Sequence, residues 1–157
     1  MTRKDRLIQE YTHDPYLLKG KHHDPSVCTK CGLVFHDGIF EWLNAKPPKA
    51  QKMTCPACRR IDDAYEGGHV VLEGTFISGH KSDVVNTIKR VEESEKRQRP
   101  LERIMELAIG FNRIDVKTTY EHMARRIGQA IHNAFKGDLK LQYLDAEKFV
   151  RVHWKRD

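Results

Sequence analysis

The sequence predicts an α+β fold in two parts, and three observations support this. Four cysteines form two CxxC pairs in the first half of the chain, at Cys28, Cys31, Cys55 and Cys58. The rest of the chain has no cysteine and shows clear strand and helix periodicities. Hydrophobic residues make up 39% of the 157 residues, which is enough for a modest core. We expect an irregular N-terminal arm over residues 1–25, a cysteine module over 26–66 and an α/β domain over 67–157.

The cysteine spacing predicts a metal site. Two residues within each pair let both thiolates reach one ion, and the 23-residue interval between Cys31 and Cys55 lets the second pair fold back. Four thiolates are typical ligands of a single structural zinc ion in a zinc ribbon. Such a site has no open position for substrate, so its work is folding. A redox dithiol is disfavoured because two matched pairs are present, and an iron–sulfur cluster stays open.

His36 follows the first cysteine pair by five residues. Because four cysteines already complete a tetrahedron, we expect His36 to be a polar surface residue beside Asp37 and not a ligand.

The first elements of the α/β domain are a strand and a helix. "HVVLEGTFI" (69–77) is rich in β-branched and aromatic residues, which favours a strand. Residues 82–99 have helical periodicity, with Ser82 as the expected N-cap and Pro100 as the expected stop. The apolar stripe of this helix contains Val84, Val85, Ile88 and Val91.

A hairpin, a second helix and two strands follow. "RIMELAIGF" (103–111) and "RIDVKT" (113–118) alternate in polarity around Asn112, which predicts a hairpin. Thr118 and Glu121 have capping-box spacing at the start of a helix over 119–136, and Gly137 is the expected stop. The apolar face of this helix contains Met123, Ile127, Ala130, Ile131 and Ala134. "DLKLQY" (138–143) and "KFVRVHW" (148–154) then read as strands.

The element order is strand, helix, strand, strand, helix, strand, with one extra strand. This βαββαβ(β) order predicts a ferredoxin-like sandwich, with helices on one face of an antiparallel sheet and the other face open. Alternation with period two assigns the strand side chains to the two faces. The inward set is Ile114, Val116, Leu139, Leu141, Tyr143, Val150, Val152 and Trp154, and the outward set is Arg113, Asp115, Lys117, Lys140, Gln142, Phe149, Arg151, His153 and Lys155.

Charge and composition limit the classes of function. The net charge of +6 favours a polyanionic partner such as nucleic acid. No apolar run is long enough to span a bilayer and no apolar leader precedes the cysteines, so we expect a cytoplasmic protein with no membrane partner. The chain has no P-loop, GxSxG, HExxH or zinc-deaminase signature, so we expect no enzyme and no small-molecule substrate.

The candidate RNA-binding residues come from three regions. The proline-containing loop and the second cysteine pair contribute Lys46, Lys49, Lys52, Arg59 and Arg60. The open sheet face contributes Arg113, Lys117, Lys140, Arg151, His153 and Lys155, and the second helix contributes Arg125 and Arg126. Cations of this kind contact phosphates, although a solvated surface would have the same composition.

Four stretches, "PSVCTKCGLVF", "CPACRR", "FNRIDVKTTYEHMARRIGQAI" and "EKFVRVHWKR", together resemble small bacterial zinc-ribbon proteins of unsettled function. More remotely, the order is similar to the core of the archaeal and eukaryotic export adaptor family of the large ribosomal subunit. That family has four CxxC pairs where this chain has two, so nuclear export does not carry over. The resemblance implies association with the ribosome or ribosomal RNA, with the large subunit as the expected partner.

The leading hypothesis is a non-catalytic, zinc-stabilised RNA-binding factor that associates with the ribosome in assembly, protection or stress-time hibernation. The alternatives are a zinc-ribbon regulator that binds DNA, a metal-dependent nuclease around His36, and a protein–protein adaptor.

Overall fold

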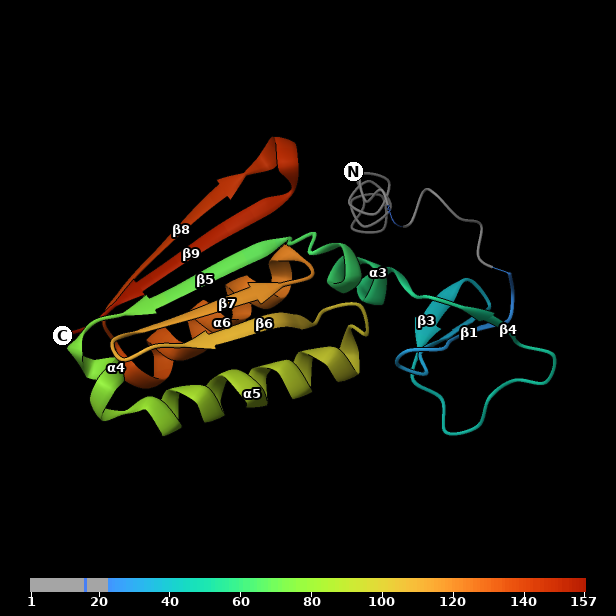
Figure 1. Ribbon diagram of the computed structural model, residues 1–157, viewed down its shortest axis with the longest axis horizontal. Coiled ribbons are helices and arrows are strands. Elements are labelled where there is room, and N and C mark those ends of the chain that lie inside the picture. The colour runs from blue at the N-terminus through green and yellow to red at the C-terminus, as the bar shows by residue number, and fades with distance from the viewer. Residues whose placement is uncertain (1–15, 17–22) are drawn as a thin grey trace. The chain divides into compact units, whose positions relative to one another are not determined.

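The computed structural model describes residue 16 and residues 23–157, and Figure 1 shows the arrangement of its helices and strands. The arm predicted over residues 1–25 lies almost entirely outside these described residues. The chain divides into two compact units, Met1–Asp63 and Ala64–Asp157. Each unit has its own sheet, and together they form a mixed α+β structure with two sheets and four α-helices among the described residues.

The first unit is a small four-stranded sheet followed by a helix. Its strands are β1 (Ser26–Cys28), β2 (Val34–His36), β3 (Ile39–Glu41) and β4 (Gln51–Met53), in the order β3-β2-β1-β4, and the helix is α3 (Pro56–Asp63). A two-residue turn at Asp37 and Gly38, both with positive φ, joins β2 to β3, as an Asp-Gly hairpin requires. Strand β4 pairs with β1 in parallel, and this pairing brings the second cysteine pair back to the first.

The second unit has five strands in one sheet, in the order β6-β7-β5-β9-β8 (Figure 1). Its elements are β5 (Gly68–Glu73), α4 (Thr75–Gly79), α5 (Lys81–Gln98), β6 (Ile104–Ile109), β7 (Arg113–Thr118), α6 (Glu121–Phe135), β8 (Asp138–Leu144), a 3-10 turn η1 (Asp145–Glu147) and β9 (Phe149–Lys155). The five strands and the two long helices follow one another as the sequence predicts, whereas the short helix α4 was not predicted.

The pairing of the last strand differs from the prediction of an antiparallel sheet. Strand β9 lies beside β5 and is parallel to it, while β8 pairs with β9 only and forms an edge. The physical reason is the β8–β9 hairpin, which reverses the chain once more before the last strand joins the sheet. The sheet is therefore mixed, and this parallel pair departs from the antiparallel arrangement that the ferredoxin-like prediction contained.

Helices α5 and α6 cover one face of this sheet. The inward side chains of the central strands include Leu72, Val116 and Trp154, all fully buried, as are Ile88 of α5 and Ile127 of α6. Burial of such side chains contributes about 1.5–3 kcal/mol each and fixes the register, because a one-residue slip would expose the whole set. The predicted inward positions of β7 and β9 are confirmed.

Three predicted positions are wrong. Tyr143 is 46% exposed, because it lies near the end of β8, which is an edge strand. Phe149, assigned to the outward face, is buried and pairs with Leu144 at the turn of the hairpin. Ala134 is exposed, because the buried face of α6 follows Ala124, Gly128 and Ile131 instead.

Element ends also differ from the prediction. The strand expected over 69–77 ends at Glu73, because Gly74 turns the chain at φ +122 and Phe76 then lies in the short helix α4. Neither Ser82 nor Thr118 caps a helix, since the N-caps are His80 and Tyr120, without side-chain capping bonds.

The start of α6 is satisfied from elsewhere in the fold. The Thr118 hydroxyl donates to the Tyr120 carbonyl, and the Met123 N–H donates to the Glu102 carboxylate at 2.8 Å. A distant glutamate therefore does the work that the capping box was expected to do.

Candidate metal centre and basic surfaces

The two cysteine pairs form two knuckles at the ends of β1 and β4. In the first knuckle the Gly32 N–H donates to the Cys28 carbonyl at 2.9 Å, and Gly32 has φ +82, which glycine adopts without strain. In the second, Cys55 precedes α3 and Cys58 lies in its first turn. The Cys55 N–H donates to the Cys28 sulfur at 3.3 Å, which links the two knuckles directly.

The four sulfur atoms form a set that could hold a metal ion. All four lie within 4.8 Å of one another, and three of the four cysteines are buried. The Cys31 and Cys55 sulfurs are 3.7 Å apart, too far for a disulfide, whose S–S bond is about 2.05 Å. A tetrahedral zinc ion with Zn–S bonds of about 2.3 Å has sulfur–sulfur edges of about 3.8 Å. The donor set and its geometry therefore fit a four-thiolate centre.

The electrostatics of the cluster also favour a cation. Burial raises the pKa of the Cys58 thiol to about 11, and the neighbouring Cys31 adds to the rise. Thiolates at this site therefore need a compensating positive charge. Lys30 supplies part of this positive charge. The pKa of its ammonium group is raised by its hydrogen bond to Asp62, and then by the negative charges of Asp62, Cys58 and Cys28. Sequence reasoning missed Lys30, although its place between the first two cysteines was visible.

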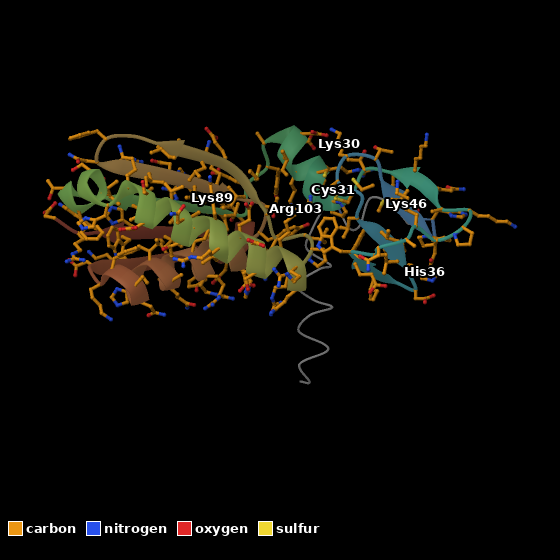
Figure 2. All side chains as sticks on the ribbon, turned by 90° about the horizontal axis from the view of Figure 1, so that it is seen from below. Lys30, Cys31, His36, Lys46, Lys89 and Arg103 are labelled. Carbon is orange, nitrogen blue, oxygen red and sulfur yellow. The ribbon has the colours of Figure 1, made fainter. Side chains whose placement is uncertain are left out.

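His36 lies outside the four-sulfur cluster. Its Nδ1 is 3.1 Å from Asp24 Oδ1 and its Nε2 is 3.4 Å from Asp37 Oδ2. In Figure 2 the labelled side chain of His36 lies apart from Cys31, whereas Lys30 lies near it. A second, exposed group of possible ligands consists of Asp24, His36 and Asp37. Hydrogen bonds among these residues are sufficient to explain why they lie close together.

The loop lysines are exposed. Lys46 and Lys49 lie in the loop before β4 and Lys52 lies on β4 itself (Figure 2 labels Lys46). Within residues 23–157, none of the three takes part in an ion pair. Arg59 is half-buried, whereas Arg60 is only 5% exposed, with its guanidinium 5.4 Å from the centre of the Tyr16 ring. The lysines are thus better placed to contact a phosphate than Arg60.

The predicted cations of the sheet lie on the face away from α5 and α6, but several are neutralised there. Arg113 donates to both oxygens of Asp115, at 2.7 and 3.1 Å, and also lies 3.9 Å from Glu73. Lys117 pairs with Glu106 at 3.4 Å. His153 contacts Glu73, so it too has an acidic partner. In the described part of the chain, Lys140, Arg151 and Lys155 have no ion pair.

One of the two predicted helix arginines, Arg126, links the two long helices. Arg126 pairs with Glu95 of α5 at 3.1 Å, and Glu95 also accepts from His122 at 2.9 Å. Arg125 lies 3.2 Å from the other nitrogen of His122. Burial alone would raise the pKa of Glu95, but the hydrogen bonds from His122 and Arg126 outweigh it and hold that pKa below its usual value. Arg126 is therefore engaged in packing α6 against α5, whereas Arg125 contacts a side chain of its own helix.

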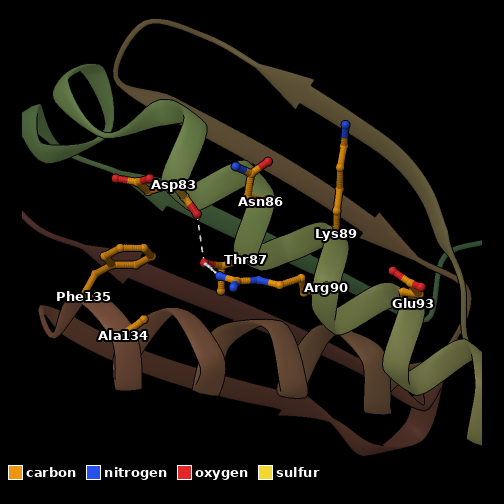
Figure 3. Close-up of a pocket in the computed structure, with 8 residues that line it drawn as sticks. All are labelled: Asp83, Asn86, Thr87, Lys89, Arg90, Glu93, Ala134 and Phe135. Atoms are coloured by element: carbon orange, nitrogen blue, oxygen red, sulfur yellow. Dashed lines mark hydrogen bonds between the residues drawn. The ribbon is translucent and has the colours of Figure 1, made fainter.

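A groove of about 630 Å³ lies between α5 and the end of α6 (Figure 3). Thr87 lies at its floor, donating to the Asp83 carbonyl at 2.9 Å and accepting from Arg90 at 3.3 Å. The rest of its lining mixes exposed acids and bases with the ring of Phe135. The groove therefore carries charges of both signs, and none of the sequence-predicted site residues lines it.

Comparisons with protein-family models, with curated proteins and with solved structures find no match to this chain. No helix of the described residues is long and apolar enough to cross a membrane. Function is therefore inferred from the geometry and chemistry described above.

Proposed function

We propose that this chain is a zinc-stabilised RNA-binding factor in which the zinc ion is structural and the loop beside it contacts RNA phosphates. The observation that carries the proposal is the four-sulfur set joined to a loop and strand β4, which together have three exposed lysines with no acidic partner among the described residues. When bound, zinc would be held by Cys28, Cys31, Cys55 and Cys58 as a zinc ribbon and would order both knuckles.

The two ordered knuckles would then hold the lysine-containing loop before β4 in a fixed position. Strand β4 connects the loop to the second knuckle, and β4 pairs with β1, which leads into the first knuckle. Fixing both knuckles therefore fixes both the direction and the register of β4. Lysines on a preordered loop lose less conformational entropy on meeting a phosphate than lysines on an unstructured segment.

The cytoplasmic ribosome, and its large subunit in particular, is the proposed partner. The positive net charge of +6 and the exposed cations of both units support a polyanionic surface as ligand. Roles in ribosome assembly, protection or hibernation would all require binding to such a polyanionic surface. The proposal is tested by sedimentation with ribosomes at low and high salt, with zinc measured in the same preparation.

A charge-matched pair of variants sharpens the test. The first replaces Lys46, Lys49 and Lys52 with alanine. The control replaces Lys89, Lys96 and Arg97 of α5, which removes the same charge from a solvated helix. If the loop binds phosphates, the loop variant lowers the dependence of log affinity on log salt by about one for each lysine that binds a phosphate, and the control does not.

Three outcomes would count against the proposal: equal effects of the two triple variants, absence of sedimentation with ribosomes at low salt, or a protein without zinc. Preference for duplex DNA over ribosomal RNA in competition would instead indicate a DNA-binding regulator.

A further inference from the structure

The open face of the second sheet carries two histidines that are each held by a carboxylate. His69 Nε2 lies 2.8 Å from Asp115 Oδ2, and His153 Nε2 lies 2.5 Å from Glu73 Oε1. The side chains of His69 and His153 are 27% and 44% exposed. In the described residues the Nδ1 atom of each ring has no hydrogen-bond partner. Each imidazole is thus oriented through one nitrogen, while the other nitrogen is available for proton transfer.

The strand register places an arginine next to both histidines. His69 of β5 pairs directly with Arg151 of β9, and His153 is two residues further along β9 on the same face. Strand spacing of about 4.8 Å and a rise of about 3.3 Å per residue put the Cα atoms of the histidines about 8 Å apart. Arg151 is exposed and has no ion pair among the described residues, and Lys140 of β8 pairs with His153 in the register.

The carboxylates are fixed by a second interaction. Arg113 reaches Asp115 with two hydrogen bonds and lies near Glu73, so one guanidinium links both acids. The hydrogen bond from Arg113, ahead of that from His69, keeps the pKa of Asp115 below its usual value even though burial opposes this. The acid that orients His69 therefore stays ionised at neutral pH, as a positioning carboxylate must.

We propose that His69 and His153 form an acid–base pair, with Arg151 as the phosphate-binding cation, that cleaves RNA phosphodiesters next to their 2′-hydroxyl. An acid and a base on opposite sides of a phosphorus atom must each come within about 2.6–3.2 Å of their own oxygen, and the spacing above suits two such contacts. Arg151, exposed next to both, would bind the non-bridging oxygens and stabilise the charge that grows on them.

The reaction balances without metal or cofactor. One neutral imidazole takes the proton of the 2′-hydroxyl as the 2′-oxygen bonds to phosphorus. The bond from phosphorus to the 5′-oxygen breaks, and the protonated imidazole gives its proton to that leaving oxygen. The products are a 2′,3′-cyclic phosphate and a free 5′-hydroxyl. Asp115 and Glu73 do not touch the substrate. They act as positioning residues, because each orients one histidine.

This inference goes beyond the proposed binding role and rests on it for the identity of the ligand. It also replaces the expectation that the chain is not an enzyme with a specific alternative, at a site remote in sequence from His36. Alternation alone would have placed His69 and Glu73 on the outer face of β5, but only the pairing of β5 with β9 brings His153 and Arg151 beside them.

The test incubates the 157-residue chain, loaded with zinc, with deproteinised ribosomal RNA and with a short mixed-sequence single-stranded RNA. A 2′-O-methyl copy of the short RNA serves as the bound but uncleavable ligand. Binding is measured by anisotropy and cleavage by gel analysis, and the product ends are identified chemically. We expect cleavage with cyclic phosphate ends, and binding without cleavage for the 2′-O-methyl copy.

Variants assign the activity to the site. His69→Ala and His153→Ala should each lower the cleavage rate at least 100-fold, which is the scale of general acid–base catalysis, while affinity changes by less than about twofold. His69→Gln and His153→Gln keep a donor toward the carboxylate and guard against misfolding. Asp115→Asn should lower kcat at least about tenfold with KM unchanged. His36→Ala is the matched control, because it removes an exposed, acid-paired histidine from the other unit.

RNA that binds but is not cut would overturn this inference and leave the proposed function standing. Cleavage that survives in the His69 and His153 variants, or that also occurs in the 2′-O-methyl copy, would overturn it as well. Absence of RNA binding would overturn both proposals.

Discussion

Gly128 lies where helix α6 packs closely on the sheet, and replacing it with alanine tests the packing of the second unit. A Cβ atom added there would lie 2.4 Å from Val152 Cγ1 and 3.2 Å from Leu139 Cδ1. Carbon atoms in contact are normally about 3.5–4.0 Å apart, so one side must move by more than about 1 Å. Val152 is 1% exposed and β-branched, which leaves it little freedom to rotate away.

Two opposing terms set the magnitude. Alanine is favoured over glycine in a helix interior by about 0.8–1.0 kcal/mol. Overpacking costs about 1–3 kcal/mol, and the stiff neighbour places this site in the upper half of that range. We therefore expect Gly128→Ala to lower the free energy of unfolding by about 1–2 kcal/mol. For a domain of this size, that corresponds to a fall in Tm of roughly 4–16 °C.

The assay is urea denaturation followed by tryptophan fluorescence. A Trp42→Phe background leaves Trp154, which is fully buried in the second unit, as the reporter. Gly79→Ala is the control, because a Cβ atom there meets nothing within 4 Å. That control should stay within about 0.5 kcal/mol of the parent or exceed it.

A double-mutant cycle separates packing from propensity. Val152→Ala removes the atom that the new Cβ would meet, so the double variant should be more stable than the sum of the single effects predicts. We expect a coupling of at least about 1 kcal/mol. If Gly128→Ala is as stable as its parent, or if the two substitutions are additive, α6 does not approach β9 as closely as these distances require.

Two further predictions concern the metal centre and pH. Cys31→Ser should bind no zinc, and its two cysteine knuckles should become disordered, whereas His36→Ala should keep one zinc per chain. Metal analysis of both variants tests this, and loss of metal from the histidine variant would contradict the assignment of the four cysteines as the ligands. Burial, opposed by the hydrogen bond to Glu95, lowers the pKa of His122, and the pKa of Glu95 is also lowered. Both groups bind protons more readily in the unfolded chain, so the stability they contribute is complete above about pH 6.5, the usual pKa of histidine. It is lost first as the pH falls below that value, and then further as the pH falls through the lowered pKa of Glu95. The free energy of unfolding from urea titrations should therefore decrease from pH 7 to pH 4, and His122→Gln should flatten the upper part of this fall; an unchanged pH profile in that variant would contradict the assignment.

The two long helices and the strands of the second unit could be predicted because each has a local periodicity in polarity. Val84 and Ile88 recur at helical spacing, and Ile114 and Val116 alternate as a half-buried strand does. The cysteine cluster could also be predicted, because the spacing of the two pairs alone indicates that the four thiols converge. What periodicity does not record is which strand lies beside which, and the parallel neighbour of β5 was missed for that reason.

The charge balance of the open sheet face was also beyond local reasoning. Alternation correctly placed Arg113 and Lys117 on that face, but their neutralisation by Asp115 and Glu106 depends on side-chain geometry and register. At Gly74 a local preference misled the prediction. Phe76 and Ile77 favour a strand by type, yet the turn at Gly74 places them in α4, where Phe76 packs against Trp154.

The parallel pairing of β5 with β9 is expected to slow the folding of the second unit. The contact between Glu73 and His153 joins residues 80 positions apart, and every helix and hairpin of the unit lies between them. Contacts of such long sequence separation cost loop entropy before they return any stability, and they slow folding. While the chain is being synthesised, β5 can find β7 but still presents an unpaired edge on its other side. Strand β9 therefore acts as the final closure of the sheet, and until it arrives this central strand is open to pairing with other chains.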